Sequence, residues 1–470
     1  MADKVFGSGD RLSYDEDLTG ADVLPSRSPE MEPDSIEPVR SLETLVGSAE
    51  IQPWAAIDPA LQARIEAAII PGHSVSGLVL PRTSAELAAT IAEAHQQHQT
   101  VLPCGHGSKL NWGGLVKAPD WIVSTDRLNR LIDHAVGDLT VTVEAGIGFA
   151  EVQATLAKAG QFLAIDPAFP ERATIGGIVA TGDTGSLRQR YNSVRDMLLG
   201  ITFVRADGAI AKAGGRVVKN VAGYDLMKLF TGSYGTLGIL TQMTFRVYPL
   251  PEASETVVLS GDTIALTQAT QTLLNSALTP ASADLISKAV AVDLAIGKEI
   301  CLAVRFQSIV PSVQEQISRT IALGQALGLT ATTFQSTDDT TLWQQLRERM
   351  TLAPQPDGIT CKIGVRPTAA IAVFQQIEAI VSSDWAGQVH IASGLGRLTC
   401  SSTAPEMLEQ VRSLLQTHSG FLSILQAPAS FKQQVEVWGY SGNALEVMRG
   451  LKRQFDPQFL LSPHRFVGGI

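Results

Sequence analysis

The chain has 470 residues, of which 45% are hydrophobic and 17% charged, a balance typical of a globular protein with two or three hydrophobic cores. Its net charge is −10, and the first 50 residues, with twelve acidic and four basic side chains, hold −8 of it. A nearly neutral body excludes a basic nucleic-acid-binding surface. No stretch reaches the roughly 18 consecutive apolar residues that a membrane-spanning helix needs.

The N-terminal segment 1–50 is rich in Ser, Pro, Asp and Glu and lacks helical or strand periodicity before about Leu42. It predicts a disordered acidic segment, either a solvated tail or a docking arm for a partner. No basic region followed by an apolar stretch opens the chain, so we expect no secretory signal and, by default, a cytoplasmic protein. The four cysteines form no C-x-x-C pair, which argues against an iron–sulfur cluster or a metal site in this chain.

Helices and strands alternate in the next 200 residues. A helix is expected over 58–70, with Asp58 as N-cap before Pro59, and a second over 83–97, where Thr83 and Glu86 have capping-box spacing. Strands are predicted at 77–80, 100–103, 121–124, 139–144, 199–205 and 238–247, and further helices at 149–159, 176–181 and 224–230.

A Pro-Leu-Pro run at 249–251 indicates a domain boundary, because X-Pro bonds favour extended linkers. The alternation continues beyond it, with strands expected at 301–306, 361–365 and 390–398 and a long helix at 311–327.

The first glycine-rich loop, PCGHGSKLNWGG (103–114), follows a strand directly. Closely spaced glycines allow successive backbone N–H groups to face one concave site, which suits a diphosphate. Ser108 offers a hydroxyl donor, and Lys109 can offset phosphate charge. A tight turn without a ligand is the alternative.

The second loop, RATIGGIVATGDTG (172–185), places Thr174 as a helix N-cap before Gly176 and Gly177. The sequence predicts free N–H groups in the first helical turn that face an anion. The alternative is a packing helix with small residues. Neither loop is a Rossmann fingerprint, since Gly146-x-Gly148 has Glu151 where the third glycine belongs.

A third segment, GRVVKNVAGYDL (215–226) followed by LFTGSYGTLGI (229–239), completes a resemblance together with SVRD (193–196). The chain resembles the vanillyl-alcohol-oxidase (PCMH-type) FAD domain, and in detail the flavin-binding E subunit of bacterial glycolate oxidase, related to D-lactate dehydrogenases. The resemblance is strong over about 75–250, weak beyond, and returns at FDP (455–457).

The resemblance implies an α+β fold. A PCMH-type FAD-binding domain of two α/β subdomains would occupy 51–250, and a smaller α+β cap domain with an antiparallel sheet 251–440. A C-terminal helix and tail, 441–470, would return to the FAD domain. The implied FAD-binding residues are Gly105, His106, Gly107, Ser108, Lys109, Thr174, Gly176, Gly177, Ala180, Thr181, Gly182, Gly238 and Ile239. Tyr224 and Asp225 would support the site or pack.

The chain departs from the family pattern in two places. Covalent members carry a histidine just after the first-loop glycines, where this chain has Ser108, so noncovalent FAD is expected and His106 is a loop residue. Catalytic members also carry a histidine- and acid-rich strand near the C-terminus. Its counterpart VHIASGLGR (389–397) keeps only His390, so the sequence assigns no catalytic residue.

The first functional hypothesis is therefore an FAD-binding subunit of a glycolate (2-hydroxy acid) dehydrogenase complex. A paralogous flavoprotein subunit would oxidise the acid and an iron–sulfur subunit would pass on electrons, with possible peripheral contact with the inner face of a membrane through the complex. The alternatives are a free-standing 2-hydroxy-acid dehydrogenase and a non-redox nucleotide-binding subunit.

Overall fold

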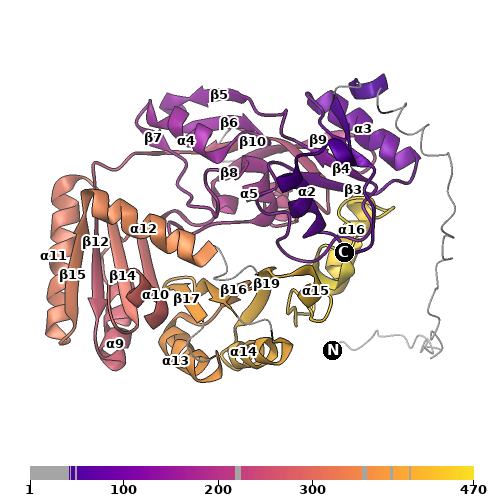
Figure 1. Cartoon of the computed structure of the whole chain (residues 1–470). Helices are drawn as coiled ribbons and strands as arrows, with labels where there is room; N and C mark the ends of the chain where they lie inside the picture. Colours follow the sequence, from indigo (N-terminus) through magenta and orange to yellow (C-terminus); the bar gives the residue numbers. More distant parts are fainter. Residues whose placement is uncertain are drawn as a thin grey trace, which may run out of the picture.

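The computed structural model describes residues 42, 44–47, 50–216, 224–351, 357–381, 385–401 and 404–470. The chain forms two halves, an N-terminal half built on two small sheets and a C-terminal half built on one large sheet (Figure 1). Most of the acidic segment predicted to be disordered lies outside the described residues. Within it, Leu42 and Glu50 are buried in the N-terminal half, 1% and 3% exposed.

The first sheet has four strands in the order β1-β2-β4-β3, with β2, β4 and β3 parallel. Their bounds are β1 Ile51–Pro53, β2 Gly77–Val79, β3 Val101–Cys104 and β4 Trp121–Ser124, and the helices of this unit are α2 Pro59–Glu66 and α3 Ser84–Gln96. Asp58 caps α2 through the N–H groups of Ala60 and Leu61. Thr83 caps α3, but Glu86 accepts from the N–H of Arg82 rather than closing a capping box.

The second sheet is antiparallel, in the order β5-β6-β10-β8-β9. Its strands are β5 Leu131–Ala135, β6 Thr140–Glu144, β8 Leu198–Val204, β9 Ile210–Gly214 and β10 Ile239–Arg246. The edge strands β5 and β9 were not predicted from the sequence. Neither strand has a buried residue, so neither shows the run of buried apolar positions typical of a strand in a core. The helices of this unit are α4 Phe149–Ala157, α5 Ile175–Thr181, α6 Arg188–Tyr191, α7 Val194–Met197 and α8 Leu226–Phe230, and a small ribbon pairs β7 Gln161–Phe162 with β11 Tyr248–Pro249.

The C-terminal half contains an eight-stranded sheet in which every neighbouring pair is antiparallel, in the order β15-β12-β14-β13-β17-β18-β16-β19. The strands are β12 Ala253–Ser260, β13 Ser282–Ile286, β14 Cys301–Ser308, β15 Thr330–Gln335, β16 Ile359–Gly364, β17 Trp385–His390, β18 Leu395–Cys400 and β19 Phe421–Gln426. The expected single strand 390–398 is wrong, because the chain turns between β17 and β18 at Gly394.

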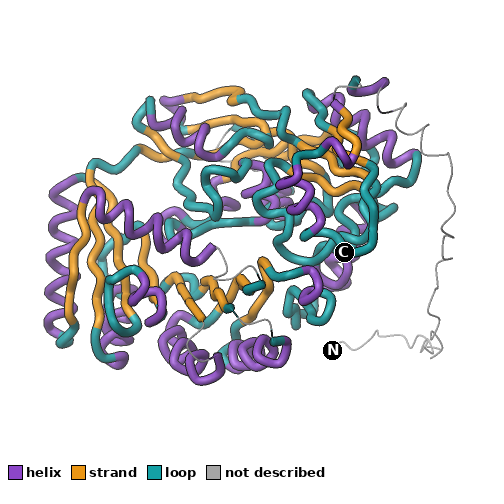
Figure 2. The backbone as a smooth tube through the Cα atoms, in the orientation of Figure 1, coloured by secondary structure: helices purple, strands orange, loops and turns teal. Residues whose placement is uncertain are grey.

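Helices cover both faces of this sheet (Figure 2). One core contains side chains of α9 Thr263–Leu274, α11 Val310–Ala326, α13 Ala370–Val381 and α14 Pro405–Thr417. The core on the opposite face contains side chains of α10 Lys288–Asp293 and α12 Ser336–Thr351. The α+β class with an antiparallel sheet in the C-terminal half is confirmed.

Residues 429–470 lead back to the N-terminal half through α15 Ala429–Lys432 and α16 Leu445–Phe455. Leu461 packs in the core of the first sheet, and Val101 donates a backbone hydrogen bond to Leu460. The fully buried Lys452 donates to the carbonyl oxygens of Thr236 and Leu461 and pairs with Asp456 at 2.7 Å. The N-terminal half therefore contains segments from both ends of the described chain.

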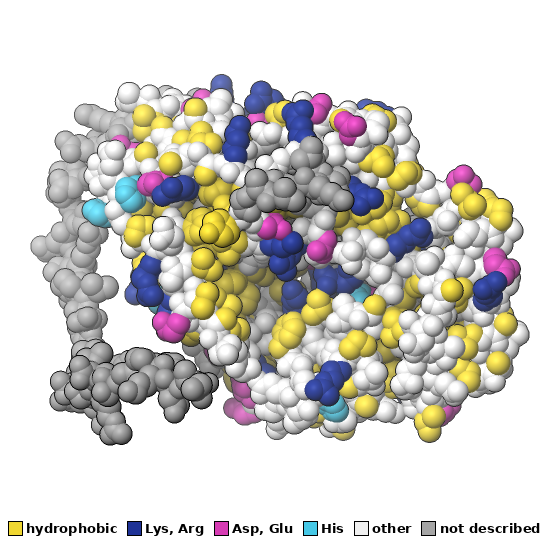
Figure 3. All heavy atoms as spheres, turned by 180° about the vertical axis from the view of Figure 1, so that it is seen from behind, with side chains coloured by type: hydrophobic (Ala, Val, Ile, Leu, Met, Phe, Trp, Pro, Cys, Tyr) yellow, Lys and Arg dark blue, Asp and Glu magenta, His cyan; other side chains and the backbone are white. Residues whose placement is uncertain are grey.

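The rear face is hollowed near its middle, and basic and acidic side chains are interspersed over it (Figure 3). Within the ranges described, none of the helices combines the length and apolar character needed to cross a membrane.

Candidate functional site: two neighbouring cavities

The two glycine-rich loops meet. The backbone of Gly105, just beyond β3, lies so close to the Thr174 side chain that a Cβ on Gly105 would overlap it. Both loops line one cavity of about 90 Å³ that is partly open to solvent. Its wall consists of Pro103, Cys104, Gly105, Gly107, Ser108, Lys109, Leu110, Thr125, Ala145, Thr174, Gly176, Gly177, Ala180, Thr181, Ser233, Tyr234, Gly235, Gly238, Ile239, Leu240 and Arg465. We call this space the loop cavity.

The first loop presents a row of unused donors. Within the described chain, the backbone N–H groups of residues 105–109 have no hydrogen-bond acceptor. Gly107 has φ of +73°, a left-handed conformation that turns consecutive N–H groups toward one side. Because buried or cleft-facing N–H groups need acceptors, this row fits an anionic ligand with several oxygens.

The second loop contributes in a different way from the one expected. The N–H of Gly176 donates to the carbonyl of Ala145 at 2.8 Å, and the N–H of Gly177 donates to the Thr174 hydroxyl at 3.3 Å. A Cβ on Gly176 would lie 2.9 Å from that of Ala145. These glycines therefore permit close packing and leave room beside α5, and the free donors belong to the first loop.

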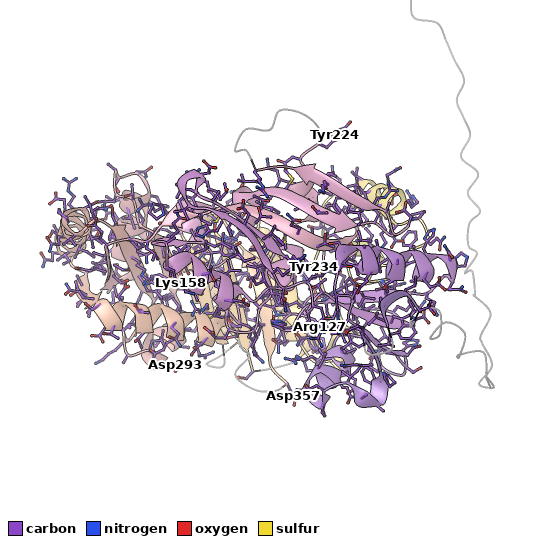
Figure 4. All side chains as sticks on the ribbon, turned by 90° about the horizontal axis from the view of Figure 1, so that it is seen from above. Arg127, Lys158, Tyr224, Tyr234, Asp293 and Asp357 are labelled. Carbon is purple, nitrogen blue, oxygen red and sulfur yellow. The ribbon has the colours of Figure 1, made fainter. Side chains whose placement is uncertain are left out.

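Eleven of the thirteen predicted residues line the loop cavity, and His106 and Gly182 do not. His106 points to Asp126, with Nε2 2.9 Å from Oδ1, and this hydrogen bond raises the pKa of His106. Gly182 ends α5 with φ of +61°. Tyr224 is 91% exposed and extends from the surface (Figure 4), so it does not support the site. Residues 217–223 of the third family-like segment lie outside the described residues.

Tyr234 and Arg465 are the main wall residues that sequence reasoning missed. Tyr234 lies in the interior (Figure 4), with φ of +56° and its N–H bonded to the carbonyl of Ala180, so its loop docks on α5. Burial raises the pKa of the Tyr234 hydroxyl. Arg465 comes from the C-terminal tail, where no local motif marks it. The GSYG run (232–235) around Tyr234 was the available signal for that side chain.

A buried ionic cluster lies between the two halves. Asp183 accepts from Arg397 of β18 at 2.6 Å and pairs with Lys109 of the first loop at 3.5 Å. Both cations also lie over the Trp112 ring, at 5.5 and 5.6 Å from its centroid. Burial lowers the pKa of Lys109 to about 8, although Asp183 partly opposes the shift. The cluster links the wall of the loop cavity to the large sheet.

A second, larger space lies beyond this cluster, between α4, the loop after α5, α12 and the large sheet; we call it the inter-half cavity. Its volume is about 620 Å³, and its lining includes His390, Arg305, Arg347, Arg397 and Asp166. Arg305 and Arg397 are paired with Asp339 and Asp183. Arg347 has no ion-pair partner among the described residues, and its Nε is buried without a hydrogen bond.

His390 has an acidic partner from a neighbouring strand. Its Nδ1 lies 2.7 Å from Oδ1 of the fully buried Asp284, the residue directly opposite it where β13 pairs with β17. The other oxygen of Asp284 accepts from Ser186 of the N-terminal half and from Gln388. Burial acts to raise the pKa of Asp284, but His390 and these hydrogen bonds together lower it. Through its hydrogen bonds to Ser186 and His390, the Asp284 carboxylate joins the two halves.

Residues 75–214 match a family model described as an FAD binding domain. The match begins just before β2 and ends with β9, and it contains both glycine loops. Residues 75–214 are thus similar to an FAD-binding domain. The geometry fits this cofactor, since the first-loop N–H groups lack acceptors in the described chain and Gly176 and Gly177 line the same cavity.

Curated relatives are named dehydrogenases and oxidases. The chain is 42% identical to glycolate oxidase subunit GlcE of Escherichia coli over 125 residues, 26% of this chain and 36% of that protein. It is 28% identical to glycolate oxidase subunit GlcD of Bacillus subtilis over 212 residues, 45% of each chain. With a probable mitochondrial D-lactate dehydrogenase of Danio rerio the identity is 25% over 419 residues, 82% of this chain and 83% of that one. The chain thus spans less than half the length of the two glycolate oxidase subunits.

The fold is that of a larger group of solved proteins. A structure of p-cresol methylhydroxylase with substrate bound superposes with a TM-score of 0.72 at 14% identity, covering 91% of this chain and 96% of that one. At this identity the likeness shows the fold alone, a PCMH-type FAD-binding architecture. No group of three or more His, Cys, Asp or Glu side chains in the described ranges could hold a metal ion.

Proposed function

We propose that the protein is an FAD-dependent oxidoreductase that acts on 2-hydroxy acids of the glycolate and lactate type, as the FAD-binding subunit of a glycolate dehydrogenase or oxidase complex. The observation that carries the proposal is the run of backbone N–H groups at 105–109 that have no acceptor in the described chain, beside a cavity that the second glycine loop completes. The names of the glycolate oxidase relatives, each called a subunit, support the substrate class and a multi-subunit assembly. We propose a paralogous flavoprotein and an iron–sulfur subunit as the partners.

Within the loop cavity the first-loop N–H groups would bind the diphosphate, and Gly176 and Gly177 would allow the cofactor to approach α5. FAD, when bound, supplies two-electron chemistry as the acceptor of a hydride from a substrate carbon. His106 is held by Asp126 and does not line the cavity, which supports noncovalent binding. Precipitation of purified protein with acid should release all yellow colour into the supernatant; colour retained on the polypeptide contradicts noncovalent attachment.

A second candidate, a free-standing 2-hydroxy-acid dehydrogenase, is favoured by the inter-half cavity. Asp284 holds Nδ1 of His390, which leaves Nε2 to take the proton of a substrate hydroxyl, and Arg347 offers an unpaired cation to a substrate carboxylate. The two groups come from β17 and α12 and share one cavity.

The absorption spectrum of the purified chain distinguishes the candidates. Bleaching of the flavin near 450 nm by glycolate or D-lactate with the chain alone supports the free-standing enzyme, and His390→Gln should then slow bleaching about 10²–10⁴-fold. Bleaching only after addition of a paralogous flavoprotein subunit supports the subunit. His134→Gln, at a histidine that lines neither cavity, is the control. A chain that retains no FAD under any condition contradicts both.

A further inference from the structure

Two buried cationic side chains from the C-terminal part of the chain donate hydrogen bonds to backbone carbonyl groups of the first glycine loop. Lys432, at the end of α15, donates from Nζ to the carbonyl oxygens of Asn111 and Gly113. Arg465 donates from Nη2 to the carbonyl oxygens of Lys109 and Leu110. Four carbonyl groups of residues 109–113 are thus directed toward positive charge.

Neither cation is paired with a carboxylate in the described chain. Lys432 is 5% and Arg465 is 4% exposed, and no Asp or Glu in the described chain forms an ion pair with either of them. Nε of Arg465 is buried without any hydrogen-bond partner. An unpaired charge that is buried lowers the stability of the fold by roughly several kcal/mol unless an anion compensates it. In keeping with this, burial lowers the pKa of Lys432 to about 7 and that of Arg465 to about 10.

Arg465 is also held in position before any ligand binds. Its carbonyl accepts from the N–H of Gly114 and from Nε1 of Trp438, at 3.1 and 3.2 Å. Its guanidinium lies 5.7 Å from the ring centroid of Tyr234, and the side chain lines the loop cavity. A fixed, desolvated guanidinium with a free N–H is suited to a phosphate oxygen.

We propose that Arg465 binds the diphosphate of FAD directly, and that Lys432 is a positioning residue. Lys432 keeps the first loop in the conformation that leaves the N–H groups of residues 105–109 free. This inference rests on the proposed FAD site and extends it to the C-terminal tail, some 250 residues beyond the matched domain. The guanidinium of Arg465 lies in the wall of the loop cavity, whereas Lys432 reaches only the loop carbonyl groups. The FAD-binding site is therefore incomplete without residues 432–465.

The test compares ligands that carry or lack the diphosphate. Dissociation constants of FAD, ADP and riboflavin are measured by titration calorimetry or fluorescence for full-length wild type, Arg465→Met, Arg465→Lys and Lys432→Met. We expect Arg465→Met to weaken FAD and ADP about 10–100-fold and riboflavin less than about 3-fold. Arg465→Lys should recover part of the loss, and Lys432→Met should show the same selectivity with a smaller effect.

Arg412→Met is the matched control. Arg412 is a buried arginine, 6% exposed, that donates to a backbone carbonyl and lines neither cavity. Wild-type affinity for ADP in Arg465→Met overturns the inference, as does an equal loss for riboflavin and ADP. If wild type itself binds neither FAD nor ADP, the proposed function fails, and this result is distinct from the other two.

Discussion

The two cavities differ in what lines them: mainly backbone groups and small residues in the loop cavity, and side chains in the inter-half cavity. The loop cavity is lined mainly by glycines, hydroxyl-bearing residues and backbone groups of short contiguous segments. The inter-half cavity is lined by side chains from α4, the loops beside α5, α12 and the large sheet, which are far apart in sequence. A site made by backbone conformation leaves its pattern in the local sequence, because φ > 0 and close approach require glycine. A site made by side chains from different elements leaves none.

The ionic cluster between the cavities gives the first and largest test of this comparison. Asp183→Asn leaves Lys109 and Arg397 buried without their carboxylate, so we expect unfolding free energy to fall by about 3–5 kcal/mol. Chemical or thermal denaturation followed by circular dichroism measures the change. Glu299→Gln, which removes an exposed pair with Lys288, should cost less than about 1 kcal/mol. Equal effects of the two variants would show that the halves are not joined through Asp183.

The contact between the two glycine loops gives the second test. Gly105→Ala places a Cβ against the Thr174 side chain and should push the loops apart, at a cost of about 1–3 kcal/mol in FAD binding, or roughly 5–150-fold. FAD content and dissociation constant measure this loss. Gly137→Ala is the control, because a Cβ there meets nothing within 4 Å. Wild-type affinity in Gly105→Ala argues against a backbone-built site.

The smallest expected effect concerns His106, which lies beside the first loop. Its hydrogen bond to Asp126 raises the pKa of His106 above 6.5, so the pair stabilises the fold below that pH and the benefit is lost as pH rises through the higher, folded-state pKa. Since both side chains are more than a third exposed, the effect should stay below about 1 kcal/mol. The difference in melting temperature between wild type and Asp126→Asn should shrink from pH 5.5 to pH 8.5, while FAD affinity is unchanged. A difference that is constant over this range contradicts the assignment.

Several features of the fold were predictable because they depend on neighbours in the chain. The caps of α2 and α3 follow from Asp58 and Thr83, and both side chains accept the expected N–H groups. The edge strands β5 and β9 were not found, since their exposed or half-buried residues give no apolar period. The strand expected at 390–398 failed because a turn at Gly394 interrupts an apolar run.

The sequence alone determined where the two glycine-rich loops lie, because close approach and the positive φ of Gly107 require glycine, and it predicted a dinucleotide as the ligand. Only the tertiary structure decided that Gly176 donates to Ala145, that Asp284 is the acid of His390, and that Arg465 faces the loop cavity. Strand register and the return of the tail bring these groups together from residues more than 100 positions apart in two of the three cases. Such contacts depend on packing of whole elements, and no local pattern encodes them.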